Sequence, residues 1–200
     1  GRLDGTADAA LPLYRRILEL QPQHLKALEG REDALGILLQ NARDALQRGE
    51  LAKASAAIAI VQRYDRGHAD LPDAQALLTQ VADDVRRRAD RDLLAGRLSR
   101  AADGYRQWQA SGVDVLAAND ALVEVARAHV RIARAAAADF RFDRAQEALD
   151  AAQLLAPELA ELAPAREALQ RAERARQAAG PALSPRMLQR RVRALLAEAA

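Results

Sequence analysis

Cysteine is absent from this chain of 200 residues, which excludes a disulfide framework, a thiolate nucleophile and a cysteine metal site. Aromatic residues make up only 3% of the sequence, and β-branched residues are also scarce. The abundant residues are Ala, Leu, Arg, Glu and Gln, which all favour helices. Half of the sequence is hydrophobic, enough for a continuous core in a chain of this length. We therefore expect an all-α fold.

Charge of one sign is not in excess either, because 30 Lys and Arg stand against 28 Asp and Glu. This near balance gives little reason to expect a nucleic-acid partner. No apolar run is long enough to cross a bilayer and no signal peptide opens the chain, so we expect no transmembrane segment in this chain. Composition leaves both the bacterial cytoplasm and the periplasm open as compartments.

The motifs of common catalytic and metal sites are missing. His24, His68 and His129 lie far apart, and none has a His, Asp or Glu four residues away as a helical zinc site requires. Asp65 and Asp70 share a predicted loop with His68, which we interpret as a solvated turn, with a weak metal or proton-sensing site as the alternative. No nucleophile elbow and no phosphate-binding glycine loop occur. We expect no catalytic residue, no metal and no cofactor.

One short stretch recurs along the chain and organises it. Residues 49–54 (Gly-Glu-Leu-Ala-Lys-Ala) return almost position for position as residues 96–101 (Gly-Arg-Leu-Ser-Arg-Ala). Residues 140–145 (Phe-Arg-Phe-Asp-Arg-Ala) are a third version without glycine. Each copy lies between two amphipathic helical patterns, so each is predicted to be the bend of a helical hairpin.

The apolar periodicity predicts where the helices lie. We expect them over residues 7–20, 25–48, 52–66, 72–94, 115–139, 144–155 and 159–179, with a short helix between residues 96 and 111. Gly30 and Gly36 weaken the second helix, which bends or divides there, and Pro164 interrupts the last. The sequence Gly-Pro-Ala-Leu-Ser-Pro at 180–185 is a predicted linker, and residues 186–200 are a predicted C-terminal capping helix.

The same periodicity predicts which residues of each helix are buried. The expected faces are Ala10, Leu13, Tyr14 and Ile17; Leu51, Ala54, Ile58 and Val61; Leu77, Leu78, Val81 and Val85; Ala101, Tyr105 and Trp108; Leu116, Leu122, Val125, Val130 and Ile132; and Ala145, Leu149 and Ala152. Tyr105 and Trp108 are three residues apart on one face of a short helix, which favours core packing over ligand stacking. The small-residue run 135–138 predicts a close helix crossing.

Ala10, Ala54, Ala101 and Ala145 stand at equivalent positions, at intervals of 44, 47 and 44 residues. A large residue follows each alanine after four positions and a medium one after seven, and two of the helices end at a proline. These followers are Tyr14, Ile58, Tyr105 and Leu149; then Ile17, Val61, Trp108 and Ala152; and the prolines are Pro22 and Pro157. This pattern resembles the second helix of the tetratricopeptide repeat.

The resemblance covers nearly the whole chain, with two departures from the family pattern. The intervals exceed the family period of about 34 residues, and the family's first-helix tryptophan and glycine have no clear counterpart. Ala42, Ala89 and Ala133 stand where that glycine would be. The resemblance implies a right-handed α-solenoid of antiparallel helix hairpins over residues 1–179, with about three and a half to four units. Helical repeats of other families, with periods of about 40–47 residues, stay open.

Tetratricopeptide proteins hold a peptide or partner segment on a concave surface lined by first helices. The resemblance therefore implies a partner-binding surface here, made by Arg43, Gln47, Asp90, Leu94, Arg134 and Ala138. The family's carboxylate-binding set of basic residues and asparagines is not reproduced, so recognition of a peptide C-terminus is not implied. The capping helix is the other candidate surface.

The leading functional hypothesis is a non-enzymatic helical-repeat scaffold that binds a protein or peptide partner. The alternative is a ligand-sensing or docking domain of a larger bacterial membrane receptor, since the chain also resembles segments that accompany receptor-type Ser/Thr kinases. The first helix has no partner before it, and we expect that the chain was cut from something longer. A homo-oligomer that exchanges this helix is the third possibility.

Overall fold

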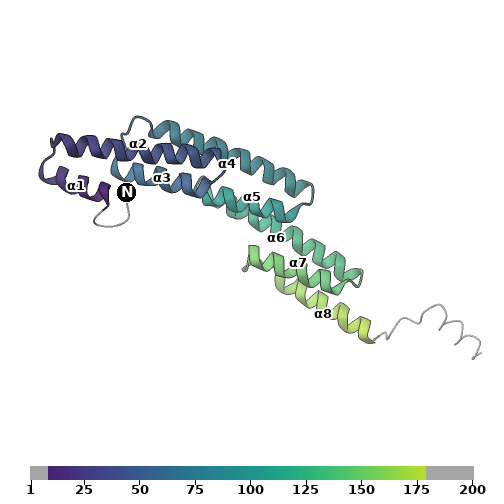
Figure 1. The fold of residues 1–200 in the computed structure, drawn as a ribbon. Helices are drawn as coiled ribbons and strands as arrows, with labels where there is room; N and C mark the ends of the chain where they lie inside the picture. Colours follow the sequence, from purple (N-terminus) through teal and green to yellow (C-terminus); the bar gives the residue numbers. More distant parts are fainter. Residues whose placement is uncertain (1–8, 179–200) are drawn as a thin grey trace, which may run out of the picture. The chain divides into compact units, whose positions relative to one another are not determined.

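In the computed structural model, residues 9–178 are described, and all their regular secondary structure is helical (Figure 1). The helices are α1 (Ala10–Leu20), α2 (Leu25–Gln47), α3 (Leu51–Tyr64), α4 (Leu71–Leu94), α5 (Leu98–Ala110), α6 (Val115–Ala138), α7 (Phe142–Leu155) and α8 (Leu162–Ala178). The expected all-α fold is therefore confirmed. The predicted linker 180–185 and capping helix 186–200 lie outside the described residues.

The chain divides into two compact units, Gly1–Val125 and Ala126–Ala200. The first unit holds α1 to α5 and the beginning of α6, and the second holds the remainder of α6 with α7 and α8. The single array predicted over residues 1–179 stays a prediction, and the two units are described separately below.

The turns after α2 and α4 share one hydrogen-bond pattern. Gly49 has φ of +74° and Gly96 has φ of +71°, in the left-handed region that glycine enters without steric cost. The amide of Gly49 donates to the carbonyl of Leu46, and the amide of the next residue reaches back five positions to Ala45. The equivalent two bonds occur at Gly96. Both helices thus end in the Schellman motif, which satisfies their last carbonyl groups.

The third predicted bend follows the same geometry without glycine. Phe140 has φ of +59°, its amide donates to Ala137, and the amide of Arg141 donates to Ala136. A bulky side chain in this region carries a steric cost of about 1–2 kcal/mol. The recurring stretch therefore forms the same kind of turn in all three places, once with strain.

In the first unit, α2 packs against α3 and α4 packs against α5. The buried residues of α3 are Leu51, Ala54, Ile58 and Val61, as predicted, and Ala101, Tyr105 and Trp108 of α5 are also buried, as predicted. The approach of α4 to α5 is especially close, because a Cβ atom added to Gly104 would lie 2.8 Å from Cβ of Ala89. Small residues at this crossing let the two backbones come together.

The predicted buried face of α4 is wrong in part. Leu78 is buried, but Leu77, Val81 and Val85 are only half-buried. The buried line instead consists of Leu71, Ala74, Leu78, Ala82 and Ala89. Because α4 contacts α2 and α3 as well as α5, its buried residues do not follow the single apolar face that the sequence period predicts.

Three further predictions for the first unit need correction. α2 runs unbroken through Gly30 and Gly36. A Cβ atom on Gly30 would lie 2.5 Å from Cζ of Tyr14, so this glycine makes room for the α1 tyrosine.

In α1 the buried residue is Leu11, whereas Leu13 and Ile17 are exposed. Leu116 of α6 is 78% exposed. In α1 the sequence period alone assigned the buried face incorrectly. In α6 the error is confined to Leu116 and the half-buried Ile132, because Leu122, Val125 and Val130 are buried as predicted.

In the second unit, α7 packs against α8, and Ala145, Leu149 and Ala152 of α7 are fully buried, as predicted. α8 begins at Leu162, so Pro164 lies in its first turn, where its missing amide is tolerated. The predicted interruption at Pro164 is therefore wrong, because the proline lies at the start of the helix.

Candidate functional site

Two of the predicted partner-binding residues lie near the end of α2. Arg43 Nη2 lies 3.5 Å from Oδ2 of Asp70, in the loop before α4. This ion pair connects α2 to the loop between α3 and α4. Gln47, the last residue of α2, is exposed and makes no hydrogen bond within the described part of the chain. Of the two, Gln47 is the one presented to solvent without an internal contact.

Of the two candidates on α4, Asp90 has internal contacts and Leu94 is presented to solvent. Asp90 accepts a hydrogen bond of 2.7 Å from Oη of Tyr105, and its other oxygen lies 3.1 Å from Nη1 of Arg86. Burial and this hydrogen bond raise the pKa of Tyr105, so the phenol stays protonated and keeps donating. Leu94, the last residue of α4, is 88% exposed. Asp90 thus fixes the α4–α5 contact, whereas Leu94 offers an apolar side chain to solvent.

Arg86 connects Asp90 with the buried aromatic pair of α5. Its guanidinium carbon lies 5.8 Å from the ring centroid of Trp108, and the rings of Tyr105 and Trp108 lie 6.4 Å apart. Both aromatic side chains are buried, which supports core packing as their role.

The remaining two candidates belong to the second unit. Arg134 lines a hollow of about 200 Å³ together with Arg127, Val130, Arg131 and Glu161. Ala138 is exposed at the end of α6 and does not line this hollow. Within the run 135–138, only Ala136 and Ala137 are buried. Of the residues that line the hollow, the sequence named only Arg134, because the resemblance selects helix positions and does not show which residues surround them.

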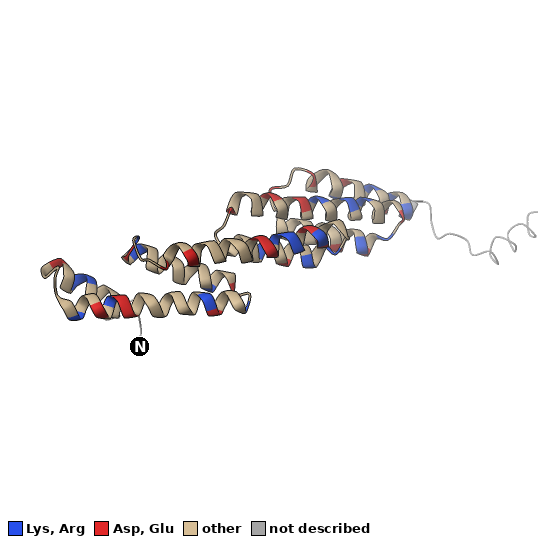
Figure 2. Ribbon diagram, turned by 90° about the horizontal axis from the view of Figure 1, so that it is seen from above, with Lys and Arg blue, Asp and Glu red and all other residues tan. Residues whose placement is uncertain are grey.

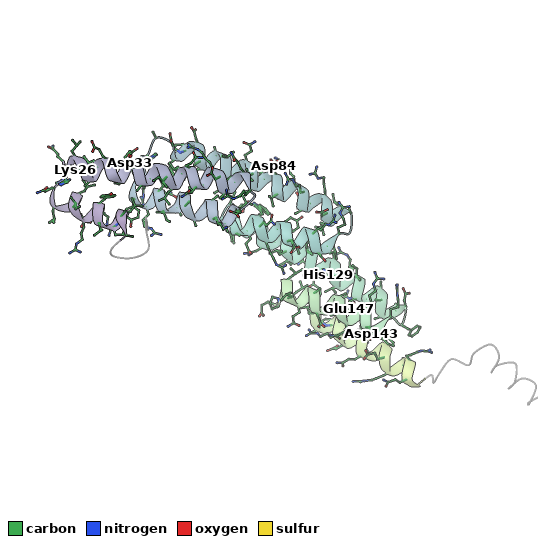
Figure 3. The ribbon with its side chains drawn as sticks, viewed as in Figure 1. Lys26, Asp33, Asp84, His129, Asp143 and Glu147 are labelled. Carbon is green, nitrogen blue, oxygen red and sulfur yellow. The ribbon has the colours of Figure 1, made fainter. Side chains whose placement is uncertain are left out.

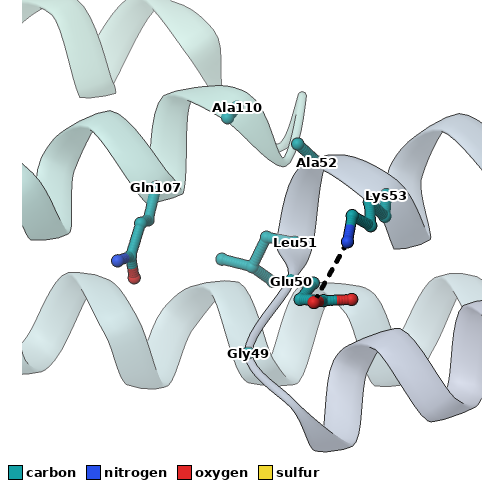
Figure 4. Close-up of a pocket in the computed structure, with 7 residues that line it drawn as sticks. All are labelled: Gly49, Glu50, Leu51, Ala52, Lys53, Gln107 and Ala110. Atoms are coloured by element: carbon teal, nitrogen blue, oxygen red, sulfur yellow. Dashed lines mark hydrogen bonds and ion pairs between the residues drawn. The ribbon is translucent and has the colours of Figure 1, made fainter.

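A second hollow, of about 230 Å³, lies beside the Gly49 turn (Figure 4). It is lined by residues 49–53 and by Gln107 and Ala110 of α5. Lys53 Nζ lies 3.1 Å from Oε1 of Glu50, and this hydrogen bond lowers the pKa of Glu50. The two charges satisfy each other. Sequence reasoning identified the turn but missed the hollow, since nothing local indicates that α5 ends beside it.

The loop that holds His68 differs from its prediction as a solvated turn, because His68 is only 8% exposed. Its Nδ1 accepts a hydrogen bond from the amide of Asp70, so in the neutral ring Nε2 carries the proton. Nε2 lies 3.2 Å from a carboxylate oxygen of Glu32 on α2. The prediction of a solvated turn is wrong for His68, which lies against α2, whereas Arg66, Gly67, Ala69 and Asp70 of this loop are exposed.

The other two histidines, His24 and His129, belong to helix α2's start and to helix α6. Nδ1 of His24 accepts a hydrogen bond from the amide of Ala27 and so caps the start of α2. His129, labelled on α6 in Figure 3, is half-buried, and burial lowers its pKa. Within residues 9–178, no group of three or more His, Asp or Glu side chains is arranged to hold a metal ion. No helix in this range has the length and apolar character that a membrane span requires.

A scan against protein-family models, a search of curated proteins and a search of solved structures found no match for this chain.

Proposed function

We propose that this chain is a helical-repeat scaffold that binds a protein or peptide partner. In this proposal the helix pairs α2–α3, α4–α5 and α6–α7 are successive antiparallel hairpins of a right-handed solenoid. The resemblance to tetratricopeptide repeats is the starting point. Such repeats stack so that each contacts mainly its neighbours and leaves an extended surface for binding.

The observation that carries the proposal is the burial of equivalent alanines. Ala54, Ala101 and Ala145 are each 0% exposed, and Ala42, Ala89 and Ala133 are at most 2% exposed. Each of the first three is the fourth residue of the second helix in its proposed pair. The other three lie seven residues before Gly49, Gly96 and Phe140. Small buried residues thus recur at the same two positions in all three helix pairs. This recurrence favours the same helix packing in each pair. The shared turn geometry at Gly49, Gly96 and Phe140 supports the same interpretation.

The side-chain environments divide the candidate residues of the first unit by role. Arg43 and Asp90 are held by Asp70 and Tyr105, so in this proposal they position the surface rather than contact the partner. Gln47 and Leu94 end α2 and α4 and are exposed. An exposed leucine beside polar groups is suited to enter a pocket or apolar strip on a partner.

A peptide selection tests this proposal. Peptides selected on the purified chain from a random displayed library are measured against the Leu94→Ser variant. We expect at least a tenfold loss of affinity, about 1.4 kcal/mol, because the exposed Leu94 side chain would supply an apolar contact to the peptide. Circular dichroism checks that the helices are unchanged, as expected for a residue that is 88% exposed.

Leu154→Ser is the matched control, since Leu154 on α7 is a leucine with a similar exposure of 76% and lies outside the proposed surface. The control is expected to keep the affinity. Equal affinities for wild type and both variants would contradict the role of Leu94, and a selection that yields no saturable binder would contradict the proposed function.

A further inference from the structure

We propose that the hollow on α6 lined by Arg127, Arg131 and Arg134 binds the side-chain carboxylates of an acidic peptide segment. This proposal rests on the proposed function, because it names the chemical class of a partner. It places the contact with the acidic segment in the second unit, whereas Leu94 belongs to the first unit. We refer to these three residues below as the arginine row.

The arginine row lies on one helical face, because its members are spaced by four and then three residues. With a rise of about 1.5 Å per residue, the row covers about 10 Å along the helix axis. Side chains on one side of an extended peptide repeat every 7 Å or so, close to the axial spacing of Arg127 and Arg131. A planar guanidinium can bind a carboxylate through two parallel hydrogen bonds.

The row is electrostatically unfavourable without a ligand. Like charges spaced at three or four residues on a helix destabilise it by about 0.2–0.5 kcal/mol per pair. Arg127 is paired with Glu161, with 3.2 Å between Nε and Oε1. Arg131 and Arg134 make no ion pair and no hydrogen bond within the part of the chain that the structure describes. Two exposed arginine side chains therefore line the hollow without an ion pair inside the described part of the chain.

Glu161 indicates the kind of ligand that fits. It lies one residue before α8 and places its carboxylate at the edge of the hollow, against Arg127. Val130, which is buried, also lines the hollow. A carboxylate from a partner can pair with Arg131 and Arg134 as Glu161 pairs with Arg127. Glu161 therefore already pairs with Arg127, and its carboxylate would compete with a carboxylate of the partner for this arginine.

The distribution of charge favours an acidic peptide over a nucleic acid. Residues 126–178 hold nine arginines and eight acidic residues, so this stretch has almost no net charge. Figure 2 shows basic and acidic residues interspersed along its helices. Nucleic acids are bound through basic stripes that follow the phosphate backbone, whereas a local hollow with three arginines suits a few carboxylates.

The test measures fluorescence anisotropy of a labelled hexaglutamate peptide, acetylated and amidated so that only side-chain carboxylates are charged. The full chain is titrated at low salt, with hexaglutamine and hexalysine as comparison probes. We expect hexaglutamate to bind at least tenfold more tightly than hexaglutamine. The double variant Arg131→Gln/Arg134→Gln is expected to lose at least tenfold in affinity for hexaglutamate.

Two controls separate the hollow from general charge attraction. Arg144→Gln/Arg171→Gln removes the same charge from exposed positions of the second unit outside the hollow and should change affinity less than twofold. Glu161→Gln removes the competing carboxylate from the hollow and should tighten binding severalfold. Glu158→Gln makes the same charge change at an exposed position outside the hollow and should not.

Several results would overturn the proposal. These are no saturable binding of hexaglutamate, equal losses in the two arginine double variants, or no gain with Glu161→Gln. Tighter binding of a thymidine oligonucleotide with six phosphates, lost in Arg131→Gln/Arg134→Gln, would assign the hollow to nucleic acid instead. None of these results alters the Leu94-dependent binding of selected peptides, so failure here is distinguishable from failure of the proposed function.

Discussion

Two glycines inside helices of the first unit have opposite surroundings. Gly104 of α5 lies against Ala89 of α4, with room for no side chain between them. Gly36 of α2 is exposed, and a Cβ atom there would meet no atom within 4 Å. By helix propensity both glycines weaken their helices, but only Gly104 has a packing reason to be glycine.

Replacement of each by alanine is expected to have opposite effects. Gly104→Ala should destabilise the protein by about 1–3 kcal/mol, because a rigid backbone-linked contact must open to admit the methyl group. Gly36→Ala should stabilise it by about 0.5–1 kcal/mol through helix propensity. Urea denaturation followed by circular dichroism measures both. A stabilising Gly104→Ala would show that α4 and α5 are further apart than the structure has them.

The turns after α2, α4 and α6 each contain a residue with positive φ, and the turn at Phe140 is strained. Phe140 occupies the position that glycine holds in the other two turns. Its ring lies 6.1 Å from that of Phe142 in an edge-to-face arrangement, and Arg176 of α8 lies over it at 5.9 Å. These contacts offset part of the backbone cost, and they give a physical reason for an aromatic residue in this turn.

A pair of substitutions separates the backbone cost from the ring contacts. Phe140→Gly should be more stable than Phe140→Ala by about 1 kcal/mol, because both lose the ring and only alanine keeps the steric cost of positive φ. Gly96→Ala should lose a similar amount relative to wild type. Thermal denaturation of the purified variants measures these differences. Equal stability of Phe140→Gly and Phe140→Ala would mean that residue 140 leaves the left-handed region.

At the scale of the whole molecule, the chain forms two compact units, with the boundary inside α6. In the proposed helical array, contacts between sequence neighbours supply the stability, so a local defect lowers stability locally.

This organisation predicts an uneven response to a defect in the first unit. In Gly104→Ala, amide hydrogen exchange should accelerate in α4 and α5 by at least tenfold more than in α7 and α8, because the lost packing lies entirely in the first unit. Mass spectrometry of peptides from each helix measures this. An equal acceleration in all helices would show that the two units unfold as one cooperative structure.

The sequence by itself determined the helices, the three turns and the buried faces of α3, α5 and α7. These features depend on local chemistry, since left-handed turn positions and the spacing of small and large residues act over a few positions. The apolar period identified the buried face in α3, α5 and α7, but not in the shorter α1, where Leu13 and Ile17 are exposed.

Tertiary structure decided which residues of the longer helices are buried and what surrounds the candidate site. α4 contacts three other helices, so Ala74 and Ala82 are buried while Val81 is not. His68 is covered by α2, and Arg43 and Asp90 are engaged by residues far from them in sequence. The hollow of the arginine row exists because Glu161, more than 30 residues from Arg127, meets it there. Contacts between residues so distant in the chain leave no local pattern, and only the folded arrangement reveals them.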